Sequence, residues 1–129
     1  MRMHVTPYLC ADGAASAIDF YKRAFGAEEI MRYDDDGRIG HAELRIGDTI
    51  VYLSDEYPPY RVFSPRTLNG NSVSLSISTD DADAVFERAL AAGATVERPL
   101  KDEGFGRSGW LIDPFGHRWN VVTPKEGSM

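Results

Sequence analysis

The sequence has a single cysteine, Cys10, among 129 residues, and it has neither a long apolar run nor a basic cluster. One cysteine excludes an internal disulfide and a zinc site built from several cysteines. A membrane-spanning helix needs about 20 consecutive apolar residues, and no run here approaches that length. The net charge of −6 gives little attraction for nucleic acid. We therefore expect neither nucleic acid nor a membrane as a partner.

The first six residues lack the apolar stretch of a signal peptide, and we expect a cytoplasmic protein. The Cys10 thiol could be a nucleophile, but burial statistics for free cysteine favour a packing role. The contents of hydrophobic residues (43%) and charged residues (26%) are ordinary for a globular protein. A chain of this length suits one compact domain or two fused half-domains.

One order of sequence patterns occurs twice along the chain. In the first half, a short strand and turn precede a segment with apolar residues at helical spacing, and Gly26 is typical of a helix end. Three strand-like segments follow, separated by turns that contain Asp and Gly. The first half therefore predicts strand, helix, strand, strand, strand. The apolar positions of its helix are Ala17, Ile18, Tyr21, Ala24 and Phe25.

The second half repeats this order. A strand at residues 72–78 precedes a helix for which Asp80 or Asp81 is the candidate N-cap. Gly93-Ala94 ends that helix as Gly26-Ala27 ends the first, 67 residues earlier (93 − 26). We predict an α+β domain over residues 1–129, with βαβββ modules at 4–57 and 72–123 and a connection at 58–71. The expected apolar face of the second helix is Ala84, Val85, Ala89 and Leu90.

Strand alternation predicts which side chains share a face. Around residues 40–46, His41, Glu43 and Arg45 take the polar face. In residues 72–78 the apolar side chains point one way, and Ser74 and Ser76 point the other. The apolar faces need cover from the helices, whereas the polar faces are either solvated or line a cavity. The same alternation predicts that Trp110 and Trp119 lie in the core on the helix side.

Three segments resemble the vicinal-oxygen-chelate superfamily, which contains glyoxalase I, extradiol dioxygenases and the fosfomycin- and bleomycin-resistance proteins. The motifs are Phe20-Tyr21 with Phe25-Gly26-Ala27, then His41-Ala42-Glu43-Leu44, and Asp113-Pro114-Phe115-Gly116-His117. The chain is most similar to the PhnB-like branch, and the resemblance spans about residues 4 to 123. It implies that each module curls its sheet into half of an open trough that holds a small molecule. It also implies a homodimer, with modules side by side or exchanged between chains.

The resemblance further implies four metal-ligand positions in the enzymes of the family, one in the first and one in the last strand of each module. Alignment on the helices and on the Asp-Pro-Phe-Gly turn assigns them to Thr6, Tyr52, Ser74 and Asn120, with both pairs 68 residues apart (74 − 6, 120 − 52). The family commonly has His or Glu there. Neutral oxygen and nitrogen groups do not suit Zn, Ni or Fe, which favour imidazole and carboxylate. We expect no cofactor; a divalent metal is possible but disfavoured, and Asn120 is expected to form hydrogen bonds.

His41 and Glu43 could supply chemistry of another kind. They could hold a relocated metal, with His4 as a third ligand, or act as a base and its orienting acid. The alternative is a solvated or ion-paired strand face that includes Arg45, and we favour it because such faces are common in sheets. His117 follows a turn glycine, and we expect it to satisfy backbone groups of that turn.

The remaining candidates concern ligand binding. Tyr8 and Tyr52 are expected to line the trough, with Ser74, Ser76, Thr6 and Asn120 as polar contacts. Arg107, expected in a flexible loop, could reach an anionic ligand or be a plain surface residue. Possible lids from the connection are Tyr60 and Phe63.

Two functions follow from these observations. The first is metal-independent binding or sequestration of a small molecule, as the resemblance to bleomycin-resistance proteins implies. The second is an enzyme, a lyase, isomerase or transferase, that uses a relocated metal or the acid/base pair of His41 and Glu43. Glyoxalase and dioxygenase reactions are disfavoured by the four ligand positions. Because this fold carries both kinds of function, the fold alone does not decide between them.

Overall fold

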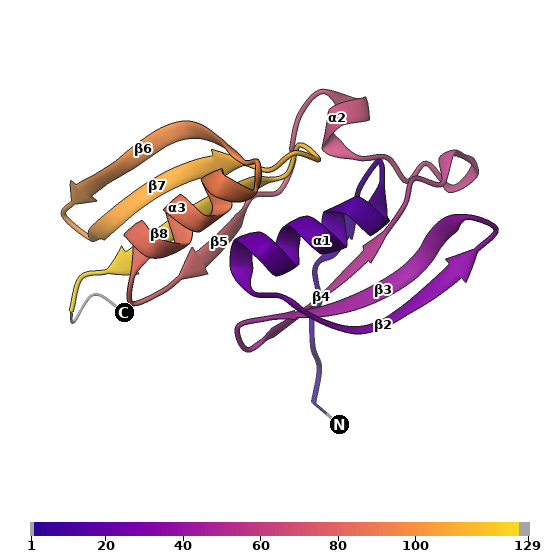
Figure 1. Cartoon of the computed structure of the whole chain (residues 1–129), viewed down its shortest axis with the longest axis horizontal. Coiled ribbons are helices and arrows are strands. Elements are labelled where there is room, and N and C mark those ends of the chain that lie inside the picture. The colour runs from indigo at the N-terminus through magenta and orange to yellow at the C-terminus, as the bar shows by residue number, and fades with distance from the viewer. Residues whose placement is uncertain (1, 127–129) are drawn as a thin grey trace.

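The computed structural model describes residues 2–126 (Figure 1). The first module contains β1 (Tyr8–Cys10), α1 (Ala14–Phe25), β2 (Glu28–Asp35), β3 (Arg38–Ile46) and β4 (Thr49–Ser54). The connection contains η1 (Pro58–Tyr60) and α2 (Pro65–Leu68), and the second module contains β5 (Leu75–Ser78), α3 (Ala82–Ala92), β6 (Thr95–Glu103), β7 (Gly106–Ile112) and β8 (Arg118–Pro124). Within residues 2–126, no helix combines the length and apolar character needed to cross a bilayer.

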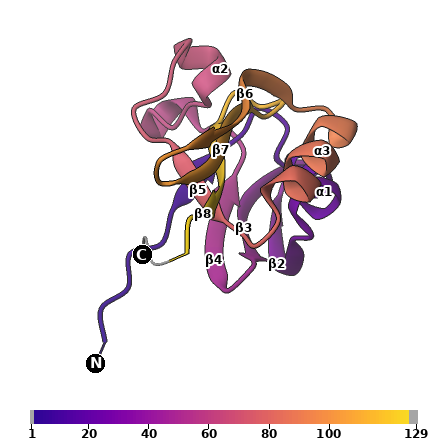
Figure 2. The same ribbon diagram turned by 90° about the vertical axis from the view of Figure 1, so that its left-hand side faces the viewer.

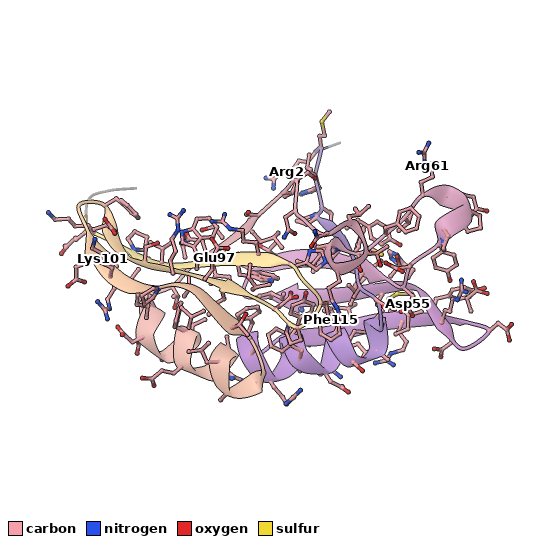
Figure 3. The ribbon with its side chains drawn as sticks, turned by 90° about the horizontal axis from the view of Figure 1, so that it is seen from above. Arg2, Asp55, Arg61, Glu97, Lys101 and Phe115 are labelled. Atoms are coloured by element: carbon pink, nitrogen blue, oxygen red, sulfur yellow. The ribbon has the colours of Figure 1, made fainter. Side chains whose placement is uncertain are left out.

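Each module forms one four-stranded mixed sheet, with strand orders β1-β4-β3-β2 and β5-β8-β7-β6. The first strand of each module is parallel to the last strand, and the other neighbours are antiparallel. Helices α1 and α3 lie beside each other on the same side of the two sheets (Figures 1 and 2). The predicted fold class, two βαβββ modules, is therefore confirmed. The sheet face turned away from the helices, uppermost in Figure 3, is called the open face below.

Helix α1 has the apolar stripe that the sequence predicts and ends where expected. Gly26 caps its C-terminus with a φ of 67°, a left-handed conformation that glycine adopts without strain. Its N-terminus is capped by a residue that is distant in the sequence. The N–H groups of Gly13 and Ala14 donate to Asp55 Oδ1 at 3.1 and 2.8 Å. Asp55 directly follows β4, so this cap fixes α1 to the end of its own sheet. The buried side chains of α1 are Ala14, Ala17, Ile18, Phe20, Tyr21 and Ala24.

Helix α3 begins as predicted but presents a different face. Asp81 is the N-cap, since its Oδ1 accepts from the Ala84 N–H at 3.1 Å. The Ala82 N–H donates to Thr123 Oγ1 of β8 at 2.8 Å, which turns Ala82 toward the sheet. Ala84 is consequently exposed, and the prediction that it belongs to the apolar face is wrong. The buried side chains of α3 are Ala82, Phe86 and Ala89.

Asp113, in the turn before β8, joins the two modules. Its buried carboxylate accepts from the Tyr21 hydroxyl of α1 at 2.5 Å and from Trp119 Nε1 at 2.9 Å. Its other oxygen accepts from the N–H groups of Phe115 and His117 within the turn. Burial, followed by the Asp113 charge, raises the pKa of Tyr21 well above its usual value. Trp119 is in the core, as predicted.

His117 makes a second link between the modules, and the prediction that it serves its own turn is incomplete. Its backbone N–H does bond Asp113 in that turn. Its buried ring reaches away from the turn, with Nε2 2.8 Å from the Cys10 carbonyl oxygen of β1. The side chain is therefore a cross-module contact between segments that are distant in the sequence.

Trp110 is not a core residue, which corrects the prediction. The register of β7 and β8 pairs Trp110 with Asn120 and Leu111 with Trp119. Because neighbouring residues of a strand point to opposite faces, Trp110 and Trp119 cannot share the helix side. Leu111 is buried under the helices, whereas Trp110 is half-buried on the open face, with the Arg118 guanidinium 3.7 Å from its ring centroid.

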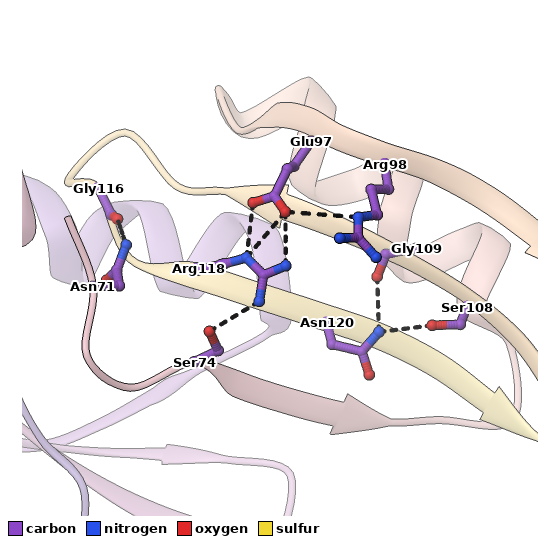
Figure 4. A network of polar contacts seen from close by, with 9 residues as sticks. All are labelled: Asn71, Ser74, Glu97, Arg98, Ser108, Gly109, Gly116, Arg118 and Asn120. Atoms are coloured by element: carbon purple, nitrogen blue, oxygen red, sulfur yellow. Dashed lines mark hydrogen bonds and ion pairs between the residues drawn. The ribbon is translucent and has the colours of Figure 1, made fainter.

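The connection packs against the rest of the chain at both ends. Glu56 accepts from Thr67 Oγ1 at 2.5 Å and from the Ser64 N–H at 2.8 Å, and the first of these bonds mainly lowers the Glu56 pKa. Asn71 Nδ2 donates to the Gly116 carbonyl at 2.9 Å (Figure 4). These bonds fix the connection to the two modules, and Tyr60 of η1 lines the site described next.

Candidate functional site

The open face of the first sheet carries a cluster of aromatic and titratable side chains. Alternation along β3 buries Ala42 and Leu44 against α1 and turns His41 and Glu43 to the open face. This confirms the prediction that His41 and Glu43 share a face. Tyr52 of β4 pairs with Glu43, and it also pairs with Tyr8 of β1.

Three of these side chains form a continuous chain of hydrogen bonds. The Tyr8 hydroxyl oxygen lies 2.6 Å from His41 Nδ1, and His41 Nε2 lies 2.9 Å from Glu43 Oε2. An ionised carboxylate only accepts, so a neutral His41 that bonds both neighbours donates from Nε2 to Glu43 and accepts a hydrogen bond from the Tyr8 hydroxyl at Nδ1. Burial and then the Glu43 charge raise the pKa of Tyr8, which keeps its hydroxyl protonated. We call Tyr8, His41 and Glu43 the proton chain.

Aromatic contacts hold the proton chain in place. The ring of Tyr52 lies edge-on to those of Tyr8 and His41, with centroid separations of 5.4 and 4.8 Å. The Tyr8 and His41 rings also meet edge-on at 5.3 Å. Such edge-to-face arrangements are the favoured geometry for aromatic pairs. The geometry of the proton chain is therefore fixed by packing as well as by hydrogen bonds.

A cavity of about 560 Å³ adjoins Tyr8, and we call it the tyrosine pocket. Its walls include Tyr8 of β1, Tyr33 of β2, and Tyr57 and Tyr60 of the connection. The predicted lid Tyr60 thus lines it, whereas Phe63 is not among the lining side chains. Among residues 2–126, Asp35 is the one charged residue of the lining. The other lining residues are Leu9, Cys10, Gly40, Ser54 and Val62.

Cys10 is buried at this pocket and has the packing role that its residue type predicts. Burial, and then the charges of Glu56, Asp55 and Asp12, raise the pKa of its thiol to about 12. A nucleophilic cysteine needs a lowered pKa, because the thiolate is the reactive form. The geometry and charge around Cys10 therefore oppose the nucleophile alternative.

The strand register shows which residues are paired near the four positions that the resemblance implies. Tyr8 pairs with Tyr52, and Ser76 pairs with Asn120, and the two pairs are again 68 residues apart (76 − 8, 120 − 52). Thr6 and Ser74 lie before β1 and β5, two residues ahead of these partners. Both first strands are shorter than their sequence alternation indicated. The residues directly paired across the parallel strands are thus Tyr8 with Tyr52 and Ser76 with Asn120, and like Thr6 and Ser74 they are neutral groups.

Asn120 is committed to contacts within its own sheet. Its Nδ2 donates to Ser108 Oγ at 2.7 Å and to the Gly109 carbonyl at 2.9 Å (Figure 4). Its Oδ1 accepts from the Ser76 hydroxyl at 2.8 Å. The side chain is buried, and three partners use the hydrogen-bonding capacity of its amide almost completely. Asn120 forms hydrogen bonds as expected, and the partners are protein groups.

The rest of the open face of the second sheet is occupied by paired charges. Arg118 bonds Glu97 at 2.7 Å and Ser74 Oγ at 3.1 Å (Figure 4). Its guanidinium also stacks on the Trp110 ring. The hydrogen bonds from Arg118 are the main cause of the lowered Glu97 pKa. Ser74, the residue just before β5, therefore contacts the Arg118–Glu97 ion pair through Arg118.

Arg107 lies in β7, and the expectation of a flexible loop is wrong. Its guanidinium donates to both carboxylate oxygens of Asp83 at 2.9 and 3.0 Å and to Asp102 at 3.2 Å. Because Asp83 is on α3, Arg107 anchors the helix to the hairpin edge of the sheet. Its charge is already matched by two carboxylates.

The candidate third ligand, His4, is exposed in the segment before β1. Across residues 2–126, no group of three or more His, Cys, Asp or Glu side chains is arranged to hold a metal ion. Sequence reasoning overlooked Tyr33, Asp35 and Tyr57 as site residues. The sequence does contain a signal for Tyr33, because pairing the two segments on either side of the Asp-Gly turn puts Tyr33 opposite His41.

Comparison with known proteins agrees with this geometry. The model of the Glyoxalase/Bleomycin resistance protein/Dioxygenase superfamily matches residues 3–121, and the chain belongs to this superfamily. A Mycobacterium tuberculosis protein, the uncharacterized Rv0887c, is 44% identical over 125 residues, which is 93% of this chain and 74% of that protein.

Solved structures show the same fold along the whole length. TioX from Micromonospora sp. is 28% identical with a TM-score of 0.73, and the match covers 96% of this chain and 100% of TioX. The PhnB protein from Bacillus cereus is 26% identical with a TM-score of 0.67, over 94% of this chain and 99% of that one. The similarity to a PhnB protein agrees with the resemblance seen in the sequence.

Proposed function

We propose that this protein binds a small organic molecule, without a metal, in the tyrosine pocket of its first module. The observation that carries the proposal is a cavity of about 560 Å³ walled by four tyrosines beside the open face. Small-molecule sites typically have volumes of about 300–1,000 Å³ with mostly apolar, aromatic walls and a few polar groups. The Tyr8 hydroxyl and the Asp35 carboxylate provide those polar groups.

The donor set supports binding that does not depend on a metal. First-row divalent ions favour imidazole and carboxylate ligands, whereas the four positions implied by the resemblance offer Thr6, Tyr52, Ser74 and Asn120. The paired residues Tyr8 and Ser76 add only hydroxyl groups. The Tyr8 hydroxyl is bonded to His41, and its raised pKa disfavours the phenolate that a metal would need. The Asn120 amide oxygen already accepts from Ser76. These residues do not fit a divalent metal.

The test combines calorimetry with a variant that closes the pocket. A Cβ added at Gly40 would lie 3.2 Å from Tyr33 Cδ2 and 3.4 Å from the Tyr57 hydroxyl, so Gly40→Val fills space between these rings. Gly70→Val is the matched control, because nothing lies within 4 Å of a Cβ there. Ligands are first found by thermal-shift screening of chelator-treated protein.

We expect Gly40→Val to lower the affinity for a ligand found in this way by about tenfold or more. Gly70→Val should leave this affinity unchanged. Titration of the chelator-treated parent with Zn, Ni, Mn and Fe(II) is expected to give flat traces. Tight binding of one metal per chain, or full ligand affinity in Gly40→Val, would contradict the proposal.

The proton chain favours a second candidate, an enzyme that moves a proton on a substrate in the tyrosine pocket. Tyr8 lines the pocket, and its hydroxyl is bonded through His41 to Glu43. General acid–base catalysis needs a titratable group within hydrogen-bond reach of the reacting atom. If this candidate is correct, His41→Ala abolishes turnover of a bound substrate and leaves its affinity nearly unchanged. A change in affinity alone supports the binding protein.

The proposal includes a homodimer. Met3 and Val5, in the extended segment ahead of β1, are 92% and 93% exposed in the single chain. Apolar side chains exposed to this degree in one segment are typical of an interaction site. Multi-angle light scattering should give twice the chain mass of 14.3 kDa. The variant with Met3→Ser and Val5→Ser should shift the equilibrium toward the single chain, and an unchanged dimer would exclude this segment from the interface.

A further inference from the structure

The walls of the tyrosine pocket present aromatic rings to solvent. Tyr8 is 54% exposed, Tyr33 is 60% exposed and Tyr60 is 80% exposed, which is unusual for rings that a globular chain normally buries. They come from β1, β2 and η1, which are widely separated in the sequence. The face of an aromatic ring is electron-rich and attracts cations. Several such rings around one cavity favour a positively charged guest.

The charge of the pocket points the same way. Asp35 is the one charged side chain in the described lining, and its Oδ2 accepts from the Tyr57 hydroxyl at 2.8 Å. More carboxylates stand behind the walls, with Glu43 behind Tyr8 and with Asp55 and Glu56 near Cys10. Burial is the main cause of the raised pKa values of Tyr8 and Cys10, and the charges of these carboxylates raise them further. An anionic guest would meet these charges without an opposing cation in the lining.

The chain itself already places a cation on one of these rings. The Arg38 guanidinium carbon lies 5.6 Å from the centroid of the Tyr57 ring. Arg38 belongs to the β2–β3 hairpin at the edge of the pocket, and it is exposed. This contact is within the distance range of a cation–π interaction. The Tyr57 ring is therefore positioned to accept a positive charge.

We infer that the tyrosine pocket selects organic cations, namely molecules with an ammonium or similar charged group attached to an apolar, ring-sized body. The inference rests on the proposed function and adds the chemical class of its ligand. The aromatic rings contact both the apolar body and the charge, and the Asp35 carboxylate supplies the countercharge. A cavity of about 560 Å³ accommodates such a molecule.

A matched pair of probes tests the inference. The cation 4-hydroxyphenyltrimethylammonium and the neutral 4-tert-butylphenol have nearly the same shape and differ in charge. We expect calorimetry at low salt to show that the parent protein binds the cation at least about tenfold more tightly than the neutral probe. We also expect Gly40→Val to lower the affinity for both probes, which would show that they bind in this pocket.

Variants of single charges sharpen the test. Asp35→Asn keeps an acceptor for the Tyr57 hydroxyl and removes the charge, so the preference for the cation should fall to the part that the aromatic rings supply. Asp34→Asn is the control on the same strand, since Asp34 is exposed and does not line the pocket. Arg38→Gln removes a competing cation and should strengthen binding of the cationic probe alone.

A ring variant separates aromatic character from size. Tyr33→Phe keeps the ring and should retain most of the preference for the cation, whereas Tyr33→Leu should lose part of it. Equal loss in both variants would contradict a role for the ring face.

Three outcomes overturn the inference. They are equal affinities in the parent, tighter binding of the neutral probe, and no binding of either probe. In the first two, sensitivity of the neutral probe to Gly40→Val leaves the proposed function standing, with a different ligand class. The proposed function itself also fails if the wider thermal-shift screen finds no ligand sensitive to Gly40→Val.

Discussion

The Ser76 hydroxyl donates to the Asn120 amide oxygen at 2.8 Å, across the parallel pairing of β5 and β8. The same pairing in the first module joins Tyr8 to Tyr52. These two pairs occupy equivalent places in the two sheets. The Ser76–Asn120 pair is fixed by hydrogen bonds within its sheet, whereas in the Tyr8–Tyr52 pair the Tyr8 hydroxyl lies at the edge of a cavity.

The register predicts where a metal site could be created. Ser76→His together with Asn120→Glu puts an imidazole and a carboxylate on paired residues, so this variant should bind Ni²⁺ at least about tenfold more tightly than the parent. Ser74→His with Asn120→Glu is the control, because Ser74 lies outside the strand pairing. Calorimetric titration with Ni²⁺ measures both. Equal affinities in the two variants would show that the register is not the deciding factor.

The buried bond between Tyr21 and Asp113 should contribute measurably to stability. Tyr21→Phe removes a donor from a buried carboxylate and should lower the free energy of unfolding by about 1–3 kcal/mol. Urea denaturation followed by tryptophan fluorescence measures this change, since Trp119 contacts the same carboxylate. Tyr33→Phe, at an exposed ring, should change stability by less than about 0.5 kcal/mol. An unchanged urea midpoint in Tyr21→Phe would mean that the bond makes no net contribution.

The stability of the protein should depend on pH through Glu29. Hydrogen bonds from Arg32 and then Lys22 lower the pKa of Glu29 to about 2. A carboxylate with a lowered pKa contributes stability above its unfolded pKa of about 4.3, and this contribution disappears as the pH falls toward the folded pKa. Glu29→Gln should therefore be less stable than the parent at pH 7, and the difference should vanish between about pH 4.5 and pH 2.

Urea denaturation across this pH range measures the effect. Glu28→Gln is the control, because Glu28 is largely exposed and its contact with Arg45 is long, at 3.4 Å. A difference between Glu29→Gln and the parent that persists undiminished at pH 2 would contradict the role of the charge.

The Cys10 thiol should be nearly inert in the folded protein. With a pKa of about 12, its thiolate fraction at pH 8 is on the order of a thousandfold below that of a free cysteine. Alkylation by iodoacetamide, followed by mass spectrometry, should be slow in the native state and fast in urea. A Cys10→Ser chain with Ser72→Cys provides the comparison, because position 72 is exposed. Similar native rates at the two positions would contradict the burial argument.

The sequence predicts the helices and the order of elements well, because these depend on local signals. Helical spacing identifies α1, and the conformational freedom of glycine ends it at Gly26. Asp81 is recognisable as a cap because its side chain bonds a group three residues away. Of the motifs that carry the family resemblance, one lies in α1 and its C-cap and one in the turn before β8, whereas His41-Ala42-Glu43-Leu44 lies in β3.

Non-local contacts account for what the sequence did not predict. The start of β1 depends on β4, whose paired residue is 44 positions later (52 − 8), and alternation alone does not fix that register. Trp110 was assigned to the wrong face because the pairing of β7 with β8 determines it. The tyrosine pocket combines β1, β2 and the connection, so no short stretch of sequence displays it.

The side-chain amide of Asn120 uses almost all of its hydrogen-bonding capacity within the second sheet. The two modules should therefore differ in how readily they accept substitutions. Substitutions around Asn120 disturb several buried bonds at once, so the second sheet should tolerate little change. Tyr33 and Tyr60 are largely exposed, so they can be replaced at small thermodynamic cost. New ligand preferences should therefore arise by substitution in the first module, while the second preserves the scaffold.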